Sequence, residues 1–329
     1  MIDTGPAALL LVLLALAFAW SIGAHYTGAC MGMAYALGAV RKTPALLGMA
    51  VLTFAGAAFA SGRVVENVGL HLVSNSALSF AAAAAAVGSA FALTTLYNAL
   101  RLPTSTIQIL VFSLIGVALA LGLPVDWSTL GGLVAIWVAA PFIAFALGYL
   151  LTRWFDRTQA TSPRDSQASR GGLGVAPWLV AMGLAASFAM GANDVANATA
   201  VFVSTGLTTV LLAGVVGGLA LAVGVVTWGS GLLTTVAFDV VRLDRSMATS
   251  AQLAQAAVIL ASVVLFGAFT SMNQALIGGM AGAGVARGRA SLRPRTLRGI
   301  LLGWAIGPVS GLALGAGGIV LAGLVFSTL

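Results

Sequence analysis

Neutral hydrogen-bonding side chains gather in two short segments of this 329-residue chain that are separated by half its length. The side chains are Ser105, Thr106 and Gln108 in the first segment, and Ser271, Asn273 and Gln274 in the second. Hydroxyl and amide groups donate hydrogen bonds without carrying charge. Placed together, they can replace the water around an oxyanion, so we interpret these residues as candidate anion-binding groups.

A second pair of segments is rich in glycine and has nearly the same separation, from Gly23 to Ala29 and from Gly191 to Asn197. We expect each segment to interrupt a helix, because the N-termini of half-helices carry partial positive charge and free N–H groups that can hold an anion. Thr27 is a candidate anion-binding residue here, and the candidate ion- or proton-carrying residues are Asp194 and His25.

A third pair of segments completes the pattern. The sequence Trp-x3-Pro-x4-Ala-Leu-Gly runs from Trp137 to Gly148 and again, at nearly the same separation, from Trp304 to Gly315. Three markers in one order and at nearly one spacing indicate two fused homologous halves. We therefore divide the chain into a first repeat over residues 1–152, a central loop over 153–171 and a second repeat over 172–329.

The composition predicts a protein embedded in a lipid bilayer. Hydrophobic residues make up 60% of the chain and charged residues only 7%. Apolar stretches of about 20 residues, long enough to cross a bilayer, recur from Pro6 to Leu329. We expect an all-α, multi-pass protein of the cytoplasmic (inner) membrane. Cys30 is the single cysteine, which excludes an intrachain disulfide or a cysteine-cluster metal site.

The basic residues follow membrane topology, so the net charge of +7 does not indicate a nucleic-acid partner. They cluster at Arg41 and Lys42, in the central loop and after Gly282. The positive-inside rule places these loops on the cytoplasmic side. The equivalent loops of the other half carry no such cluster, so equivalent loops are expected on opposite sides of the membrane, as in inverted-topology repeats.

Counting apolar segments gives about five crossings per half, with both termini outside and the central loop in the cytoplasm. In the first half the breaks fall near Arg63, Arg101 and Asp126, and Arg63 is the one basic residue of 15 that this count places outside. Each serine-containing segment can instead form a re-entrant hairpin followed by a helix. In both arrangements, broken helices are expected to meet at mid-membrane.

The motifs resemble those of the inorganic phosphate transporter (PiT) family. The segment from Gly191 to Ala198 matches the family signature, which members carry in both halves. The segment from Pro103 to Gln108 resembles the family's Pro-x-Ser-Thr-Thr-His motif, and Phe269 to Gln274 is a weaker copy. The resemblance implies secondary transport of an inorganic anion at a site between inverted repeats, with the Asn-Asp pairs also serving coupling sodium ions, in a homodimer. By position, the resemblance implicates Asn193 and Asn197 as anion-binding residues, together with Asp194, Ser105, Thr106 and Ser271.

Departures from the family pattern favour sulfate. His25 and Tyr26 stand where the first signature should read Asn-Asp, and both histidines of the second motif are glutamine. In this the chain resembles the sulfate-permease branch of the family. Phosphate near neutral pH still carries protons and benefits from an acceptor, whereas sulfate has none to donate. Asp194 remains as an acceptor, so a sodium- or proton-coupled phosphate transporter is the alternative; thiosulfate is a further candidate substrate.

Uptake of a dianion against an inside-negative potential needs a coupled cation or a steep gradient, since each charge costs about 2.3 kcal/mol per 100 mV. Asp194 is the acidic residue that falls in an expected helix break, and His25 can titrate near neutral pH. Fewer sodium ligands in the first half favour H⁺ over Na⁺ as the coupling cation. No cofactor is expected.

Two other function classes stay open on the sequence alone. A channel would need a continuous polar pore and could not concentrate its ion. An intramembrane enzyme would need a nucleophile and a base; His25 with Asp194 is conceivable, but no hydrolase or metal-ligand motif accompanies them. We therefore expect a carrier that is not an enzyme, whose partners are the oxyanion and the lipid bilayer.

Overall fold

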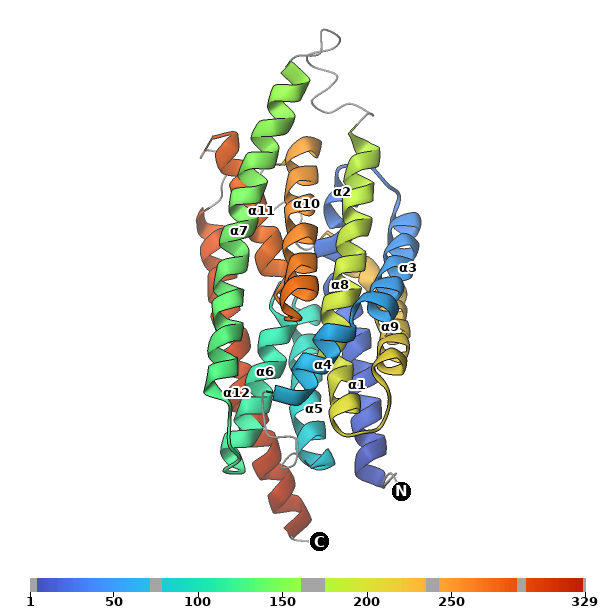
Figure 1. The fold of residues 1–329 in the computed structure, drawn as a ribbon, viewed down its shortest axis with the longest axis vertical. Coiled ribbons are helices and arrows are strands. Elements are labelled where there is room, and N and C mark those ends of the chain that lie inside the picture. Colours follow the sequence, from blue (N-terminus) through green and yellow to red (C-terminus); the bar gives the residue numbers. More distant parts are fainter. Residues whose placement is uncertain (1–4, 72–78, 161–174, 235–242, 289–293, 328–329) are drawn as a thin grey trace.

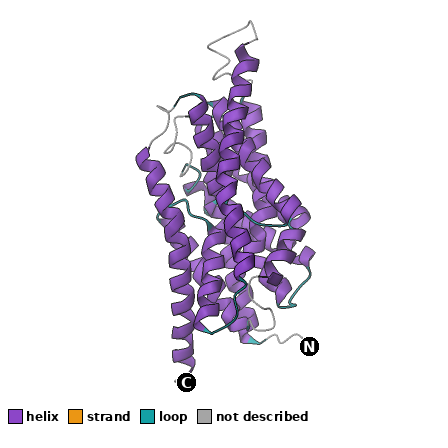
Figure 2. Cartoon of the chain, turned by 60° about the vertical axis from the view of Figure 1, so that its left-hand side comes forward, coloured by secondary structure: helices purple, strands orange, loops and turns teal. Residues whose placement is uncertain are grey.

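The chain folds into a bundle of helices drawn out along one axis (Figure 1). The structure, a computed structural model, describes residues 5–71, 79–160, 175–234, 243–288 and 294–327. Over these ranges the chain consists of helices and the loops between them (Figure 2). Eight helices within them are long and apolar enough to cross a membrane. The all-α membrane fold expected from the composition is confirmed.

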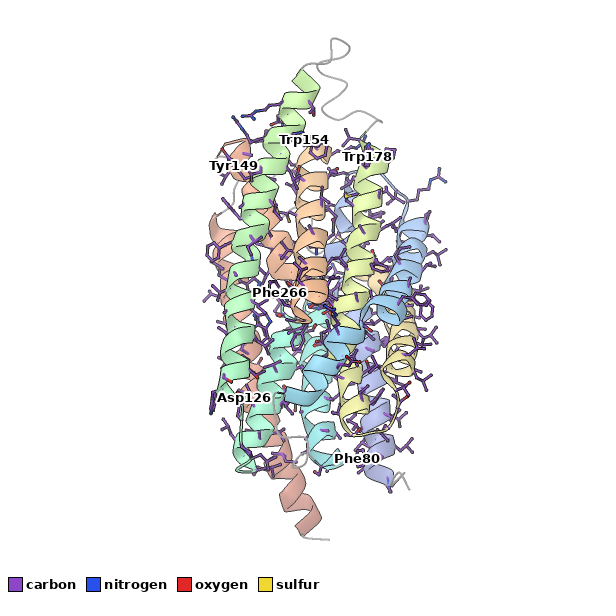
Figure 3. All side chains as sticks on the ribbon, in the orientation of Figure 1. Phe80, Asp126, Tyr149, Trp154, Trp178 and Phe266 are labelled. Carbon is purple, nitrogen blue, oxygen red and sulfur yellow. The ribbon has the colours of Figure 1, made fainter. Side chains whose placement is uncertain are left out.

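Exposed tryptophans mark two levels on the bundle. Trp154 and Trp178 lie near the end of the bundle where α7 (Trp127–Ala160) finishes and α8 (Ala176–Ser204) begins (Figure 3). Asp126, whose neighbour Trp127 is also exposed, lies toward the end that holds the start of α1 (Pro6–His25) and the end of α12 (Pro294–Ser327). Tryptophan is enriched where a membrane meets water. The apolar surface between the two levels is therefore the part that faces lipid.

The long helices of the two halves follow one another in the same order, and the short elements between them differ. The first half contains α1 (Pro6–His25), the π-helix η1 (Gly28–Gly32), α2 (Met33–Ala36), α3 (Lys42–Ala60), α4 (Gly62–His71), α5 (Phe80–Ala99), α6 (Thr106–Ala120) and α7 (Trp127–Ala160). The second half contains α8 (Ala176–Ser204), α9 (Val210–Thr227), the 3₁₀ turn η2 (Gly229–Gly231), α10 (Arg245–Ala261), the π-helix η3 (Ser262–Phe266), α11 (Met272–Ala286) and α12 (Pro294–Ser327).

Helices α5 and α6 form a re-entrant hairpin, and so do α10 and α11. Phe80, which starts α5, and Asp126, which follows α6, both lie toward the end that holds the termini (Figure 3). The second hairpin enters from the opposite end (Figure 1). The two turns meet in the middle, where Nδ2 of Asn273 donates to the backbone oxygen of Thr104 over 2.7 Å. Of the two arrangements left open for the serine-containing segments, the structure has the hairpin, so these helices are not separate crossings.

Contacts between helices repeat with the spacing of the sequence markers. Gly23 of α1 packs so closely on α9 that a Cβ there would lie 2.0 Å from the backbone oxygen of Leu221. The equivalent residue, Gly191 of α8, packs on α3, and a Cβ there would lie 1.9 Å from the oxygen of Thr53. Thr53 and Leu221 have the same separation along the chain as the two glycines. One contact is thus made twice with its partners exchanged, as expected for two repeats of one unit.

The halves are interlocked through their last helices. Gly148 of α7 packs on the backbone of Gly279 in α11, and Gly315 of α12 makes the equivalent contact with Ser113 of α6. Small residues permit such close approach of helix backbones in membranes. Helices α7 and α12 run in opposite directions along the bundle (Figure 1). Each hairpin is therefore held by the final helix of the other half.

The second glycine-rich segment does not interrupt its helix, contrary to the expectation from the sequence. Helix α8 continues through Gly191 without a break. The glycine is needed for space instead, because the α3 backbone passes where a side chain would lie. In the first segment α1 passes into the π-helix η1 rather than into two half-helices. The helix ends that meet in the middle belong to the hairpins, at Ser105 and Ser271.

Two boundaries also differ from the expectation. Helix α7 continues to Ala160, so residues 153–160 of the expected central loop are helical, in keeping with a stretch that lacks glycine and proline. Residues 161–174 of that loop lie outside the described residues. Arg101, expected at the cytoplasmic boundary, lies in the turn of the α5–α6 hairpin, because this segment turns back instead of crossing.

Candidate anion site

The two hairpin turns bring two helix N-termini to the middle of the bundle. Ser105 caps α6 and Ser271 caps α11; the Oγ of each accepts a hydrogen bond of 3.4 Å from the backbone N–H of Gln108 or Gln274. Serine is favoured at this position because its oxygen satisfies an N–H group that has no partner within the helix. Because each serine oxygen acts as the acceptor, its hydroxyl hydrogen remains available to a ligand. The N–H groups of the first helical turn that have no other partner are available as well.

Each hairpin turn is tied to a long helix by one side chain. In the second half, Asn193 bonds Thr270 twice: its Nδ2 donates to the backbone oxygen over 2.8 Å, and its Oδ1 accepts from the backbone N–H over 2.9 Å. In the first half, Nε2 of the equivalent residue His25 lies 3.1 Å from the backbone oxygen of Thr104. His25 thus takes the place of Asn193 and adds a group that can bind a proton.

Asp194 brings a carboxylate into the cluster and is fully buried. Its Oδ2 accepts from Nδ2 of Asn193 over 3.0 Å, and its Oδ1 accepts from Nδ2 of Asn197 over 3.1 Å. The same Asn197 amide lies 3.5 Å from Oγ1 of Thr106, the residue after the Ser105 cap. The structure therefore brings the carboxylate and the serine-containing motif into one site.

Asn273 links the two hairpins. Its Nδ2 donates to Thr104 and lies 3.3 Å from Nε2 of His25. Its Oδ1 is buried without a hydrogen-bond partner, as are Oδ1 of Asn197 and the hydroxyls of Thr104 and Thr270. Buried polar atoms without partners are rare in proteins. Their concentration around the hairpin turns marks this place as one that a ligand can complete.

Thr27 lies apart from this cluster. Its Oγ1 donates to the backbone oxygens of Ala24 and Gly229 over 2.9 and 3.0 Å. A hydroxyl has a single hydrogen, which these two carbonyls occupy. The structure therefore does not bring Thr27 together with the other candidate residues, and its contacts hold α1 against η2 instead.

Two polar residues that complete the cluster were missed by the sequence analysis. Oδ1 of Asn98 lies 2.5 Å from Nδ1 of His25, so that the two side chains share a hydrogen bond. The hydroxyl of Tyr26 lies 2.9 Å from Oγ1 of Thr106. Tyr26 occupies the position equivalent to Asp194, and this correspondence could have identified it. Asn98 had no such signal, because the equivalent residue of the other half is valine.

The π-helix in the first glycine-rich segment is stabilised by a side chain from the other half. Gln252 of α10 donates from Nε2 to the backbone oxygen of Ala29 over 2.9 Å. Its neighbour Gln255 donates to the backbone oxygen of Met272 over 3.2 Å. These glutamines satisfy carbonyls at irregular backbone inside the bundle. No repeat signal in the sequence pointed to them, since the equivalent positions of α5 are alanine and serine.

A cavity of about 630 Å³ adjoins the cluster but is poorly suited to an anion. It lies between α6, α7, α11 and α12, and its lining includes the equivalent pair Trp137 and Trp304. Apart from Gln108 and Gln274, the lining is mostly apolar. An oxyanion placed there would lose water without gaining enough donors. The polar cluster at the hairpin turns is the better candidate site.

The site residues are buried, with exposed fractions of at most 7% for His25, Gln108 and Gln274. Within the described residues, no group of three or more histidine, cysteine, aspartate or glutamate side chains could hold a metal ion. The arrangement can surround an oxyanion with N–H and O–H donors, beside a carboxylate and an imidazole that can exchange protons. A duplicated membrane bundle whose re-entrant hairpins meet at such a cluster has the architecture of a membrane transporter.

The chain belongs to the phosphate transporter family. The model of that family matches residues 22–181 and 172–315, which include both hairpins and both glycine-rich segments. The structure is also similar to a solved structure described as "The sodium-dependent phosphate transporter", with a TM-score of 0.84 at 20% identity over 97% of this chain and 100% of that one. This likeness shows a common fold.

Relatives named for two different anions match most of the chain. The sulfate permease CysP of Bacillus subtilis (strain 168) is 28% identical over 307 residues, covering 92% of this chain and 84% of that protein. A putative phosphate permease of Methanocaldococcus jannaschii is 26% identical over 294 residues, covering 89% and 91%. One of Pyrococcus abyssi is 24% identical over 398 residues, covering 94% and 96%. The comparisons thus support an inorganic anion transporter.

Proposed function

We propose that this protein takes up an inorganic oxyanion, preferentially sulfate, by proton-coupled secondary transport. The observation that carries the proposal is the meeting of two helix N-termini, capped by Ser105 and Ser271, beside the buried carboxylate of Asp194. The N-termini offer partial positive charge and N–H donors to an anion. Asn273 and the two glutamines add amide donors around them. Asn193 and Asn197 already donate both of their amide hydrogens within the protein, so they hold the site in place. The carboxylate can accompany the anion with a proton or cation.

The hydrogen bonds of Asp194 support sulfate over phosphate. Each carboxylate oxygen already accepts an amide hydrogen, one from Asn193 and one from Asn197. One of the two lone-pair positions on each oxygen is thus occupied within the protein, which leaves fewer acceptor positions for a phosphate hydroxyl. A fully deprotonated anion such as sulfate, or its analogue thiosulfate, needs donors alone.

Protons are the coupling ion that we favour. His25 stands where the second half has Asn193, and its two ring nitrogens contact Asn98 and Thr104. An imidazole and a carboxylate in one buried cluster provide two groups that can load and release protons. A chain that concentrates its anion in this way needs neither a cofactor nor catalysis.

The two hairpins provide an alternating-access mechanism. The α5–α6 hairpin enters the bundle from the end that holds the start of α1, and the α10–α11 hairpin enters from the end where α7 finishes (Figure 1), so each hairpin can close the site from one side. Rocking one hairpin against the final helix of the other half would open one side at a time.

We place the central loop in the cytoplasm and both termini outside. The positive-inside rule supports this orientation, because Arg41, Lys42 and Arg153 are basic residues at the end of the bundle where α7 finishes. Residues 1–152 and 172–329 are the repeats, and a homodimer in the inner membrane is the proposed assembly.

Sodium-coupled phosphate transport is the second candidate. The unpartnered Oδ1 atoms of Asn197 and Asn273 favour it, because amide oxygens are suitable ligands for a hard cation. Two of the relatives described above are named as putative phosphate permeases. The solved structure of the same fold is named as sodium-dependent.

A substrate panel in proteoliposomes separates these candidates. Labelled sulfate uptake is measured with sulfate, thiosulfate or phosphate as competitor, at two external pH values, in sodium and in choline medium. The proposal expects competition by thiosulfate, weak competition by phosphate, stimulation by an inward proton gradient and no need for sodium. Phosphate as the stronger competitor, together with a sodium requirement, would establish the second candidate. Uptake that never exceeds equilibrium would indicate a channel.

A further inference from the structure

Arg101 lies in the turn of the α5–α6 hairpin with a left-handed backbone. Its φ is +56°, and it is the only residue other than glycine with positive φ in the part of the chain that the structure describes. Gly267, the equivalent residue in the turn of the α10–α11 hairpin, has the same φ of +56°. The hairpins thus share one turn geometry, built with glycine in the second half and arginine in the first.

Glycine is the residue that this backbone conformation favours. A residue with a Cβ is strained at positive φ, whereas glycine is not. The turn at Gly267 shows that the hairpin forms without an arginine at this place. A strained residue retained next to a site points to a function of its side chain.

The guanidinium of Arg101 is exposed, and no hydrogen bond or ion pair engages it within the described residues. It lies three residues after Asn98, which bonds His25, and three residues before Thr104, which bonds Asn273. These contacts fix the turn at the middle of the bundle, beside the site. A charge at membrane depth is costly unless it is paired or reaches water. The charge is therefore tolerated only where water reaches the turn, along a route that we call the aqueous passage.

We propose that Arg101 is the capture residue of the transporter: it binds the incoming oxyanion in the aqueous passage and delivers it to the N-termini of α6 and α11. This inference rests on the proposed function and adds a residue to it. A guanidinium matches an oxyanion through paired hydrogen bonds. Because it lies outside the buried cluster, its charge raises the local anion concentration without holding the anion in the closed site.

Arg63 differs from Arg101 because its guanidinium is held by a hydrogen bond. Its Nη1 donates over 2.7 Å to the backbone oxygen of Val264, near the end of η3. It therefore offsets the partial negative charge at the carbonyl end of α10. At the equivalent turn of the other hairpin, Arg101 makes no comparable bond within the described residues and stays available for a mobile anion.

The test compares Arg101→Gly and Arg101→Lys with the matched control Arg153→Gln, which removes one charge from an exposed position on α7. Arg101→Gly gives the turn the residue that Gly267 supplies, so the melting temperature is expected to be equal to or above that of the wild type. We expect KM for sulfate to rise about tenfold in Arg101→Gly, with a smaller change in Vmax and a weaker dependence on ionic strength. Arg101→Lys should recover part of the loss, and Arg153→Gln should match the wild type.

Several outcomes would overturn the role of Arg101. An unchanged KM in Arg101→Gly does so, and so does an equal rise in Arg153→Gln, which would reveal a general effect of net charge. A wild-type KM in Arg101→Lys beside a raised KM in Arg101→Gly, both at unchanged salt dependence, would assign the residue to the backbone alone. Should Arg101→Gly fail to fold, Arg101→Asn takes its place, because asparagine tolerates this conformation. A wild type that takes up no oxyanion refutes the proposed function itself, and the capture role with it.

Discussion

Gln108 and Gln274 donate hydrogen bonds to each other across the boundary between the two hairpins. The Nε2 of each lies 3.3 Å from the Oε1 of the other, and both side chains are buried. The two residues occupy equivalent positions in the two halves, so the pair joins the halves at a position that they share. Amides stay neutral, and the pair therefore joins the N-termini of α6 and α11 without adding charge beside the site.

Replacing one of these glutamines should lower the stability of the protein by more than the loss of its own hydrogen bonds accounts for. Gln108→Leu leaves the amide of Gln274 buried without a partner, which costs about 1–3 kcal/mol. Gln274→Leu should have a similar effect. The double variant should lower the melting temperature by less than the sum of the single variants, because no amide is then left unpaired. Thermal unfolding of the four proteins in detergent checks this, and strictly additive shifts would show that the two amides are independent.

His25→Asn should keep the fold and lose the dependence of uptake on proton gradients. The equivalent Asn193 bonds Thr270 through two hydrogen bonds, and asparagine at position 25 can tie Thr104 in the same manner. It cannot carry a proton at neutral pH. Sulfate uptake at several external pH values is the measurement, with His25→Ala as a variant that loses the tie as well. A pH profile identical to that of the wild type would exclude His25 from coupling.

Asp194→Asn should abolish concentrative uptake, while exchange of external for internal sulfate survives. The amide removes a buried charge that can accompany the anion, but it leaves the helix N-termini in place. Asp126→Asn is the matched control, since it makes the same chemical change at an exposed residue outside the bundle core. Accumulation by Asp194→Asn at the wild-type level would remove Asp194 from the coupling role.

The sequence predicted which polar residues gather at the hairpin turns more reliably than it predicted the shape of the helices that hold them. Ser105 and Ser271 were found because they recur, and the structure makes both of them caps in the middle of the bundle. Gly191 was misinterpreted because glycine both interrupts helices and permits close packing. Only the neighbouring α3 backbone, which no local pattern of α8 reveals, decides between these roles.

Local sequence patterns also could not decide whether the hairpins form. Helix α5 is 20 residues long and apolar, which is enough to cross a bilayer. Whether the chain then continues or turns back depends on contacts with the other half, such as the hydrogen bond from Asn273 to Thr104. Those contacts join residues that are distant in the sequence. Local composition therefore could not place Arg101 in a turn at the middle of the bundle.

Low pH should reduce the stability that Asp126 contributes at the start of α7. Asp126 accepts hydrogen bonds from the side chain of Ser128 and from the backbone and side chain of Thr129, which lower its pKa from 3.8 to about 2. A lowered folded-state pKa contributes stability that is present above the unfolded value and is lost as the pH falls through the folded one. The wild type should be more stable than Asp126→Asn at pH 6, and the difference in melting temperature should shrink between about pH 4 and 2. A constant difference would contradict this assignment.

Arg287 joins the base of the α10–α11 hairpin to α7 through ion pairs. Within the described residues, the α5–α6 hairpin has no equivalent ion pair at its base. The guanidinium of Arg287 donates to Asp156 of α7 over 2.5 and 2.7 Å and to Asp244, the cap of α10, over 2.8 Å. Burial lowers the pKa of Arg287, but these two carboxylates more than offset it, so the pKa lies above its ordinary value. The corresponding caps of the other hairpin are the uncharged Leu121 and Ser79.

This asymmetry predicts that the two hairpins differ in mobility. In the wild type, backbone amides of α5–α6 should exchange hydrogen faster than those of α10–α11, and Arg287→Gln should selectively speed exchange in α10–α11. The substitution should cost about 1–3 kcal/mol, between the values for exposed and buried ion pairs, because the cluster is partly exposed. Arg153→Gln, on the same end of α7 as Asp156, controls for net charge. Equal acceleration in both hairpins would mean that Arg287 stabilises the bundle as a whole. Selective acceleration would identify α5–α6 as the hairpin that moves first, since its described base has no ion pair to break before it can open.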